Sequence, residues 1–173
     1  MRLKNITIER ATVHDLSALI ALFDKANAYS IERSGQAKWT NMEIAIADMS
    51  GHVKHGECYV IRSDNNIAAT MAIAHSDKFW VDDGKALYLH KLMKDTDIDV
   101  PNVGLKFLEF AANRAIEEHK EFLRCDTKPI QARLVKYYIR LGFKNKGSFK
   151  YNSTGLEGLL LEAEVSEVLK HIH

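Results

Sequence analysis

The chain contains little of three residue types that mark particular classes of protein. Only two cysteines, two prolines and nine glycines occur among its 173 residues. Cys58 and Cys125 lack C-x-x-C spacing, so we expect free, partly buried thiols in separate strands rather than a disulfide. No low-complexity segment or long linker divides the chain, and we expect one domain spanning residues 1–173 that can bury a sizeable core.

An excess of charge of one sign and long apolar runs are also absent. Lys and Arg number 24 against 23 Asp and Glu, a formal net charge of +1. This balance argues against nucleic acid as a partner, because broad phosphate contact needs a basic surface. No run approaches the roughly 18 apolar residues of a membrane span, and the first ten residues hold no apolar signal region. We expect a cytoplasmic monomer or homodimer with a small-molecule partner and no membrane partner.

What the chain does contain is a succession of strand and helix patterns. Period-two alternation and short apolar runs predict strands, and apolar residues at three- and four-residue intervals predict helices. Capping signals at Thr12 and Thr40 start two helices, and Gly51 ends the second. The predicted strands are 6–10, 57–61, 67–74, 87–93, 122–126, 146–151 and 156–164. The predicted helices are 12 to about 29, 40–51, 104 to about 119, and 131–141.

The order of these elements is β-α-α-β-β-β-α-β-α-β-β. Asp64-Asn65-Asn66 predicts a tight turn between two antiparallel strands, and one strand-helix-strand unit lies in the middle of the chain. In its helix we expect Leu108, Ala112 and Ile116 to face the core. Antiparallel hairpins around such a unit indicate an α+β fold, a mixed and mostly antiparallel central sheet flanked by helices.

A strand, a short polar loop and a helix start follow one another from Ala86 to Leu105. A helix start offers unpaired backbone N–H groups and the positive end of a dipole, so a loop ending at Gly104 can bind phosphate oxygens with main-chain atoms. The pattern favours a phosphorylated cofactor. The alternative is that residues 99–104, D-V-P-N-V-G, form an ordinary strand-to-helix connection.

The helix predicted at residues 131–141 carries paired tyrosines. It lies in the stretch Q-A-R-L-V-K-Y-Y-I-R-L-G-F, residues 131–143. With the loop before Gly104 and the order of elements, it resembles the GNAT superfamily of acetyl-coenzyme A-dependent N-acetyltransferases. Many members carry N-x-x-x-x-x-[LFY]-Y-x-x-x-G-F, and the matching residues here are Gln131, Tyr137, Tyr138, Gly142 and Phe143. The resemblance covers nearly the whole chain and is specific between about Leu89 and Phe143.

The resemblance implies an enzyme that moves an acetyl group from acetyl-coenzyme A to a primary amine by direct attack in a ternary complex. Tyr138 would protonate the departing thiolate, and a phenol keeps its proton at neutral pH. Gln131 would pair with the pantetheine arm of the cofactor. The structural alternative is that Tyr137 and Tyr138 are packing residues of an amphipathic helix.

The phosphate loop departs from the family motif [Q/R]-x-x-G-x-[G/A], in which only Gly104 matches outright. Asp99 replaces a cation, Pro101 removes an amide, and Asn102 stands where the first glycine belongs but tolerates a left-handed backbone. We expect weakened but retained pyrophosphate binding. The residues that the resemblance assigns to acetyl-coenzyme A are Leu92, Met93, Lys94, Asp99, Val100, Asn102, Val103, Gly104, Leu105 and Gln131.

The general base that must deprotonate the amine is not fixed by the motif. His90, on the fourth strand, is one candidate because an imidazole titrates near neutral pH. Asp126 and Glu57 are two others. His90 could instead be a solvent-facing or core strand residue, and Asp126 a turn or cap residue. Water relays are a further route for the proton.

The stretch S-I-E-R-S-G-Q-A-K-W, residues 30–39, resembles a segment that lies over the acceptor pocket in one subgroup of these enzymes. It assigns Tyr29 and Trp39 to the substrate side and Glu32 to attraction of a cationic amine. Trp80 is another residue predicted to line the acceptor site. Alternatively, Trp39 packs the second helix against the sheet. The acceptor itself, a small molecule or a protein amine, stays open.

A functional metal is not expected. Neither His52 with His55 nor His171 with His173 has a cysteine or carboxylate at a recognised spacing, and we expect the H-I-H end to be frayed. The rival to the enzyme is a non-catalytic acyl-coenzyme A sensor or interaction module whose loop has degenerated. Asp99 favours that rival, whereas Tyr138 favours the enzyme.

Overall fold

The computed structural model describes residues 6–152 and 154–173, which form two compact units. Unit 1 holds the described residues up to Ala72 together with Lys91–Val103, and unit 2 holds Ile73–His90 with Gly104–His173. The strands follow the order β1-β2-β3-β4-β5-β7-β6 in a mixed sheet, so the predicted α+β fold class is confirmed. None of the described helices is long and apolar enough to cross a bilayer.

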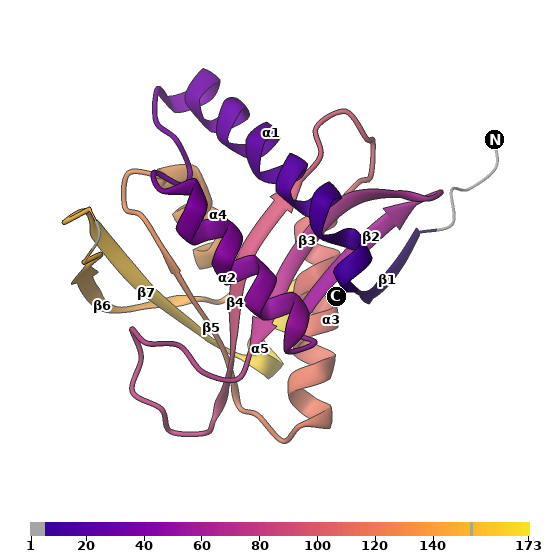
Figure 1. Ribbon diagram of the computed structural model, residues 1–173. Helices are drawn as coiled ribbons and strands as arrows, with labels where there is room; N and C mark the ends of the chain where they lie inside the picture. The colour runs from indigo at the N-terminus through magenta and orange to yellow at the C-terminus, as the bar shows by residue number, and fades with distance from the viewer. Residues whose placement is uncertain (1–5, 153) are drawn as a thin grey trace. The chain divides into compact units, whose positions relative to one another are not determined.

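Unit 1 consists of antiparallel strands covered by two helices. Its elements are β1 (Ile6–Arg10), the 3-10 turn Val13–Asp15, α1 (Leu16–Ser34), α2 (Met42–Lys54), β2 (Cys58–Ser63), most of β3 (Asn66–Ala74) and the end of β4 (Ala86–Lys94). β2 pairs antiparallel with β1 and with β3. The tight turn at Asp64 is confirmed by its positive φ of 56°. Figure 1 shows α1 and α2 on the same face of these strands.

The apolar stripes of both helices meet the strands in one core. Leu19 and Phe23 come from α1, Ala45 and Met49 from α2, and all four are buried. The remaining buried members of this core are Ala11, Leu22, Val53, Cys58, Val60 and Met93. The spacing of three and four residues along α1 thus predicted the buried face correctly.

Three predicted helix boundaries in unit 1 were wrong. α1 continues past Tyr29 to Ser34, where Gly35 adopts a left-handed backbone with φ of 71°. α2 starts after Asn41, whose side chain accepts the Ile44 N–H at 3.1 Å, so Thr40 is not its cap. Gly51 does not end α2. A helical glycine costs about 1 kcal/mol relative to alanine, and burial of the following Val53 offsets that cost.

Unit 2 contains the strand-helix-strand crossover that the sequence predicted. Its elements are the start of β4, α3 (Val103–Glu117, from Gly104 on), β5 (Phe122–Thr127), α4 (Ala132–Arg140), β6 (Lys144–Lys150), β7 (Glu157–Glu164) and α5 (Val165–Ile172). β4 and β5 are parallel, and their ladder runs from Ala86↔Phe122 to Tyr88↔Arg124. β7 pairs antiparallel with β5 and with β6.

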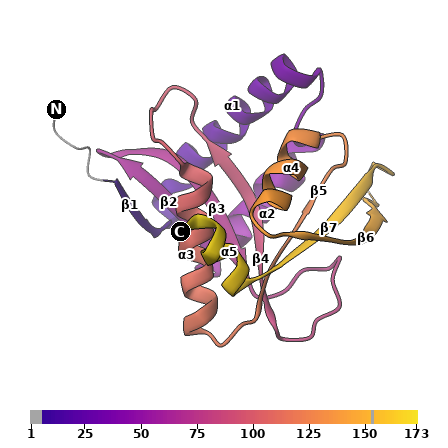
Figure 2. The same ribbon diagram turned by 180° about the vertical axis from the view of Figure 1, so that it is seen from behind.

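The C-terminal helix α5 was not predicted. Val165 and Val168 on it are buried, and His173 pairs with Glu109 of α3 at 2.8 Å. Figure 2 shows α5 beside α3. The expected frayed H-I-H end is therefore wrong, because packing gives a short helix the stability that its length alone does not. On α3 itself Leu108 and Ala112 are buried as predicted, whereas Ile116 is 53% exposed.

A buried guanidinium ties the β3–β4 loop to the sheet of unit 2. Arg124 on β5 has a side chain only 6% exposed. Its two Nη atoms donate to the Asp83 carboxylate at 2.7 and 2.9 Å, and its Nε donates to Glu162 at 2.8 Å. Nη1 also donates to the Tyr88 hydroxyl at 3.0 Å. The bonds from Arg124 hold the pKa of Asp83 well below its ordinary value.

Arg124→Met should lower the free energy of unfolding by about 2–4 kcal/mol, because it leaves Glu162 and Asp83 without their cation in a partly buried position. Urea denaturation measures the change. Lys170→Met is the control, since Lys170 is 76% exposed and lies 3.8 Å from Glu167, and it should change little. A loss for Arg124→Met no larger than for this control would show that the network does not stabilise the unit.

Candidate active site

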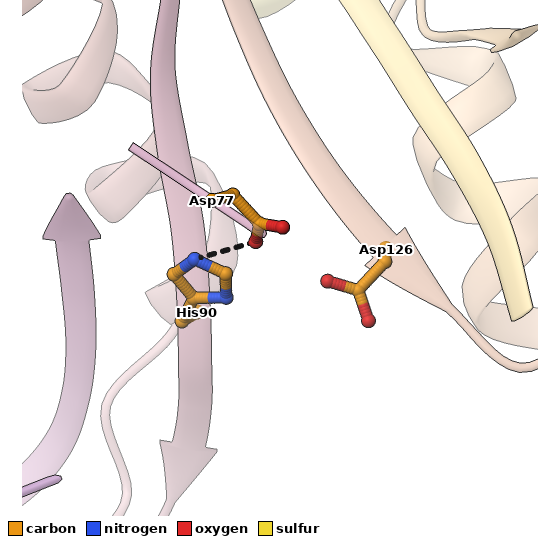
Figure 3. A group of neighbouring side chains, drawn as sticks. All are labelled: Asp77, His90 and Asp126. Atoms are coloured by element: carbon orange, nitrogen blue, oxygen red, sulfur yellow. Dashed lines mark ion pairs between the residues drawn. The ribbon is translucent and has the colours of Figure 1, made fainter. Parts of the chain in front are cut away.

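Three titratable side chains converge within unit 2, although they are far apart in the sequence. Asp77 lies on the β3–β4 loop, His90 on β4 and Asp126 on β5. One ligand-capable atom from each lies within 4.8 Å of the others. Figure 3 shows the three side chains near one another, with the dashed line joining the His90 imidazole to Asp77. The structure thus brings together two of the three predicted base candidates; the third, Glu57, pairs with His52 in unit 1 at 2.8 Å.

Asp77 was missed by the sequence analysis, and it is the most firmly held member of the cluster. His90 Nε2 lies 3.0 Å from Asp77 Oδ2, and the Phe79 backbone N–H donates to Oδ1 at 2.7 Å. The Asp77 side chain is only 5% exposed. Burial acts to raise its pKa, but the bonds from His90 and from the Phe79 amide outweigh burial and lower the pKa below its ordinary value. Asp77 is therefore a carboxylate at neutral pH.

Asp126 is held from the other side by Tyr151, which follows β6. The Tyr151 hydroxyl donates to Asp126 Oδ2 at 2.5 Å. Burial first, and then the charge of Asp126, raise the pKa of Tyr151 far above its ordinary value. The Tyr151 ring packs edge-on against Phe79 and Phe149, with centroid separations of 5.4 and 4.7 Å. Phe79, which binds Asp77, and Tyr151, which binds Asp126, therefore pack against each other.

Tyr138, the predicted general acid, is buried beside this cluster with 5% of its surface exposed. Its ring packs edge-on against Phe143 with centroids 5.0 Å apart. Burial is the main reason that its pKa lies well above the ordinary value, and Cys125 and Asp126 raise the pKa further. The phenol therefore stays protonated at neutral pH and lies near the β5 end of the cluster.

The same three groups, Asp77, His90 and Asp126, are those among the described residues whose donor atoms lie close enough together to hold a metal ion. Each already has a protein partner. His90 is paired with Asp77, and Tyr151 binds Asp126. The contacts therefore describe two neighbouring pairs of acid and base groups, His90 with Asp77 and Tyr151 with Asp126.

Gly104 also has a structural role that its motif did not suggest. It is helical within α3, and a Cβ built on it would lie 2.5 Å from the Tyr137 hydroxyl of α4. The absence of a side chain at Gly104 therefore leaves room for that hydroxyl. Tyr137 and Tyr138 point in different directions on α4: one reaches the start of α3, and the other lies near β5.

The loop after β4 keeps one feature of the predicted phosphate motif. Asn102 has a left-handed backbone with φ of 57°, as expected for a residue in the glycine position. Asp99 is exposed, whereas Val100 and Val103 are buried, so their side chains do not face solvent. Leu105, one turn into α3, is half-buried.

The end of β4, where the pantetheine was predicted, has an irregular backbone. Lys91 has φ of 55°, an uncommon value for a residue other than glycine in a strand. The Leu92 carbonyl accepts a bond from Lys38 Nζ at 2.7 Å. Met93 is buried in the core of unit 1, and Lys94 is exposed. Sequence patterns gave no signal for the left-handed residue.

The predicted acceptor-side residues of unit 1 have mixed environments. Trp39 packs edge-on against Phe23 at 4.7 Å, and its backbone N–H and C=O both bond to the Asn27 side chain. Tyr29 and Glu32 are exposed on α1. These contacts agree with the packing alternative for Trp39, and its place on the substrate side stays a prediction.

Two other predicted residues lie in unit 2. The Trp80 ring packs against the core formed by Ala74, Ala86 and Tyr88, with the Arg124 guanidinium 4.9 Å from its centroid. These contacts give Trp80 a packing role in unit 2, and its predicted place on the substrate side stays a prediction. Gln131 is half-buried and precedes the first residue of α4, with no capping bond from its side chain.

Gly104→Ala tests the close approach of the helices. The new Cβ collides with the Tyr137 hydroxyl, so the melting temperature should fall by several degrees, as for an overpacked core. In a Tyr137→Phe background the hydroxyl is gone and the loss should be smaller. Thermal unfolding of the four proteins measures the coupling. An equal loss in both backgrounds would show that the hydroxyl does not require the glycine.

No family model matches the chain. An uncharacterised N-acetyltransferase of Bacillus subtilis, YesJ, is 22% identical over 147 residues, which cover 80% of this chain and 81% of YesJ. A GNAT acetyltransferase of Listeria monocytogenes has a TM-score of 0.71 at 22% identity, covering 92% of this chain and 94% of its own. The acetyltransferase yncA of Salmonella typhimurium, solved with its cofactor acetyl-CoA, has a TM-score of 0.64 at 14% identity, covering 93% and 94%. The chain therefore has the fold of the GNAT acetyltransferases, and the resemblance predicted from its sequence is confirmed.

Proposed function

We propose that the chain is an N-acetyltransferase that moves an acetyl group from acetyl-coenzyme A to a primary amine of a small molecule. The observation that carries the proposal is the gathering of His90 and Asp126 with Asp77 in unit 2, beside the buried Tyr138. Groups able to take a proton from an amine and to give one to a thiolate are thus close to one another. The GNAT fold supports the choice of donor.

The reaction is a direct transfer. The amine nitrogen attacks the thioester carbonyl, and its proton passes to His90 or Asp126. The carbon–sulfur bond then breaks, and the coenzyme A thiolate takes a proton from Tyr138. A backbone N–H would polarise the carbonyl oxygen in this scheme.

The state of the cysteines supports transfer without an acetyl-enzyme. Burial, reinforced by the carboxylates of Asp126 and Asp77, raises the pKa of the Cys125 thiol well above its ordinary value. Burial also raises the pKa of Cys58. Because the thiolate is the nucleophilic form of cysteine, neither side chain is suited to attack a thioester at neutral pH.

Acetyl-coenzyme A would be bound chiefly by backbone groups. The start of α3 offers a positive dipole end for the pyrophosphate, and the left-handed Asn102 shapes the turn that leads to it. Lys94 is exposed, and Lys106 lies on the first turn of α3, so either can supply the cation that Asp99 replaced. Gln131 is assigned to the pantetheine arm.

Isothermal titration with acetyl-coenzyme A, followed by thiol release with a panel of amines, tests the proposal as a whole. Small mono- and polyamines, amino acids and a peptide with a free N-terminus cover the acceptor classes. Release of coenzyme A that depends on a small amine supports the enzyme. Binding without turnover on any amine would instead support an acyl-coenzyme A sensor.

Tyr138→Phe keeps the ring packing against Phe143 and removes only the acidic hydroxyl. We expect kcat to fall by about 10²-fold or more with little change in acetyl-coenzyme A affinity. Tyr137→Phe is the matched control and should change kcat far less, since its hydroxyl faces α3. Near-normal kcat for Tyr138→Phe, when chemistry limits the rate, would return Tyr138 to a packing role.

Asp99→Arg should tighten acetyl-coenzyme A binding at low salt, because it replaces an exposed anion near the proposed pyrophosphate site with a cation. The gain should shrink as ionic strength rises. Titration at two salt concentrations measures both effects. Weaker binding would mean that the Asp99 carboxylate itself supports the loop.

A further inference from the structure

We propose that Asp77 is a positioning residue for the general base. Its carboxylate holds the His90 ring by Nε2, sets the ring's orientation and stabilises the imidazolium formed when His90 takes the proton of the acceptor amine. This role rests on the proposed acetyl transfer, and it selects His90 over Asp126 as the base.

The first support is the immobility of the carboxylate. A residue that orients another must itself be fixed, and Asp77 is nearly fully buried. One oxygen faces His90 Nε2 at 3.0 Å, and the other accepts the Phe79 N–H at 2.7 Å. The Asp77 carbonyl also accepts the Trp80 N–H at 3.2 Å. With both oxygens bound, the carboxylate cannot rotate without breaking a hydrogen bond.

The second support is the anchoring of the loop that carries Asp77. Asp83, at the far end of this loop, is held by two bonds from the buried Arg124. Between them, the Phe79 ring stacks on Phe149 with centroids 4.3 Å apart. A loop fixed at two points after its functional carboxylate, Phe79 and Asp83, gives the precision that a base needs.

The third support is the charge around His90. Asp77 faces the imidazole from the loop, and Asp126 faces it from β5 with Tyr151 bonded behind. The Tyr151 hydroxyl donates to Asp126 Oδ2, so this carboxylate already has a partner on its other side. The arrangement therefore assigns proton acceptance to the imidazole and its support to the carboxylates.

Asp77→Asn is the direct test, because the amide keeps the shape and removes the charge. We expect kcat/KM for the acceptor to fall by about 10- to 100-fold, part of the effect of a general base. Its acidic limb should move to lower pH, since the protonated base loses a neighbouring anion. KM for acetyl-coenzyme A should not change. Asp82→Asn, an exposed residue of the same loop, is the matched control and should change neither quantity.

A double-mutant cycle separates positioning from a general structural effect. If Asp77 acts only through His90, Asp77→Asn should cause almost no further loss in a His90→Gln background. An unchanged acidic limb in Asp77→Asn, or an equal loss in both backgrounds, would overturn the proposal. Asp77→Glu, which keeps the charge, should recover part of the activity.

Histidine NMR gives a readout that does not depend on activity. In protein labelled with ¹⁵N-histidine, His90 should carry its proton on Nε2 at high pH, and Asp77→Asn should change the populations of the two tautomers. His90→Gln assigns the signal. Unchanged His90 signals in Asp77→Asn would overturn the positioning role. If no amine is acetylated by the wild-type protein, the proposed function fails, while this measurement still decides the role of Asp77.

Discussion

The buried guanidinium of Arg124 is the constraint on which unit 2 depends. A cation so far removed from water must be matched by anions, and here Asp83 and Glu162 supply them with the Tyr88 hydroxyl. Glu162 comes from the neighbouring strand β7, but Asp83 comes from a loop. The need to satisfy Arg124 therefore fixes that loop against the sheet, and Trp80 packs over the same guanidinium.

Fixing this loop has a chemical consequence, because the same loop carries Asp77. The loop leaves β3 and returns to β4, so anchoring it at Asp83 brings Asp77 back to His90 on β4. The β4–β5 ladder as far as Tyr88↔Arg124 also sets Asp126, two residues beyond Arg124, near His90, two residues beyond Tyr88. Structural charge pairing and proposed catalytic geometry thus lie two residues apart on each of the same two strands.

Burial has opposite consequences for the groups around this cluster. It raises the pKa of Cys125 and Tyr138, which stay protonated, because burial disfavours their charged forms and Asp126 adds a nearby negative charge. Asp77 is also buried, yet its pKa is lowered because His90 and the Phe79 amide donate to it. A proton donor and an ionised carboxylate can therefore exist side by side at neutral pH, which the proposed acetyl transfer requires.

The sequence by itself determined the order of the elements, the buried face of α1 and the left-handed Asn102, because periodicity, turn chemistry and backbone sterics are local. It also carried the resemblance to the GNAT acetyltransferases. Helix α5 and the continuation of α2 through Gly51 depended on packing that no local pattern contains. Gly104 had a motif role in the sequence, and only the tertiary structure showed that the Tyr137 hydroxyl occupies the space beside it. Asp77 had no signal at all, since its partner lies thirteen positions away on another element, and only tertiary structure decides which distant charges meet.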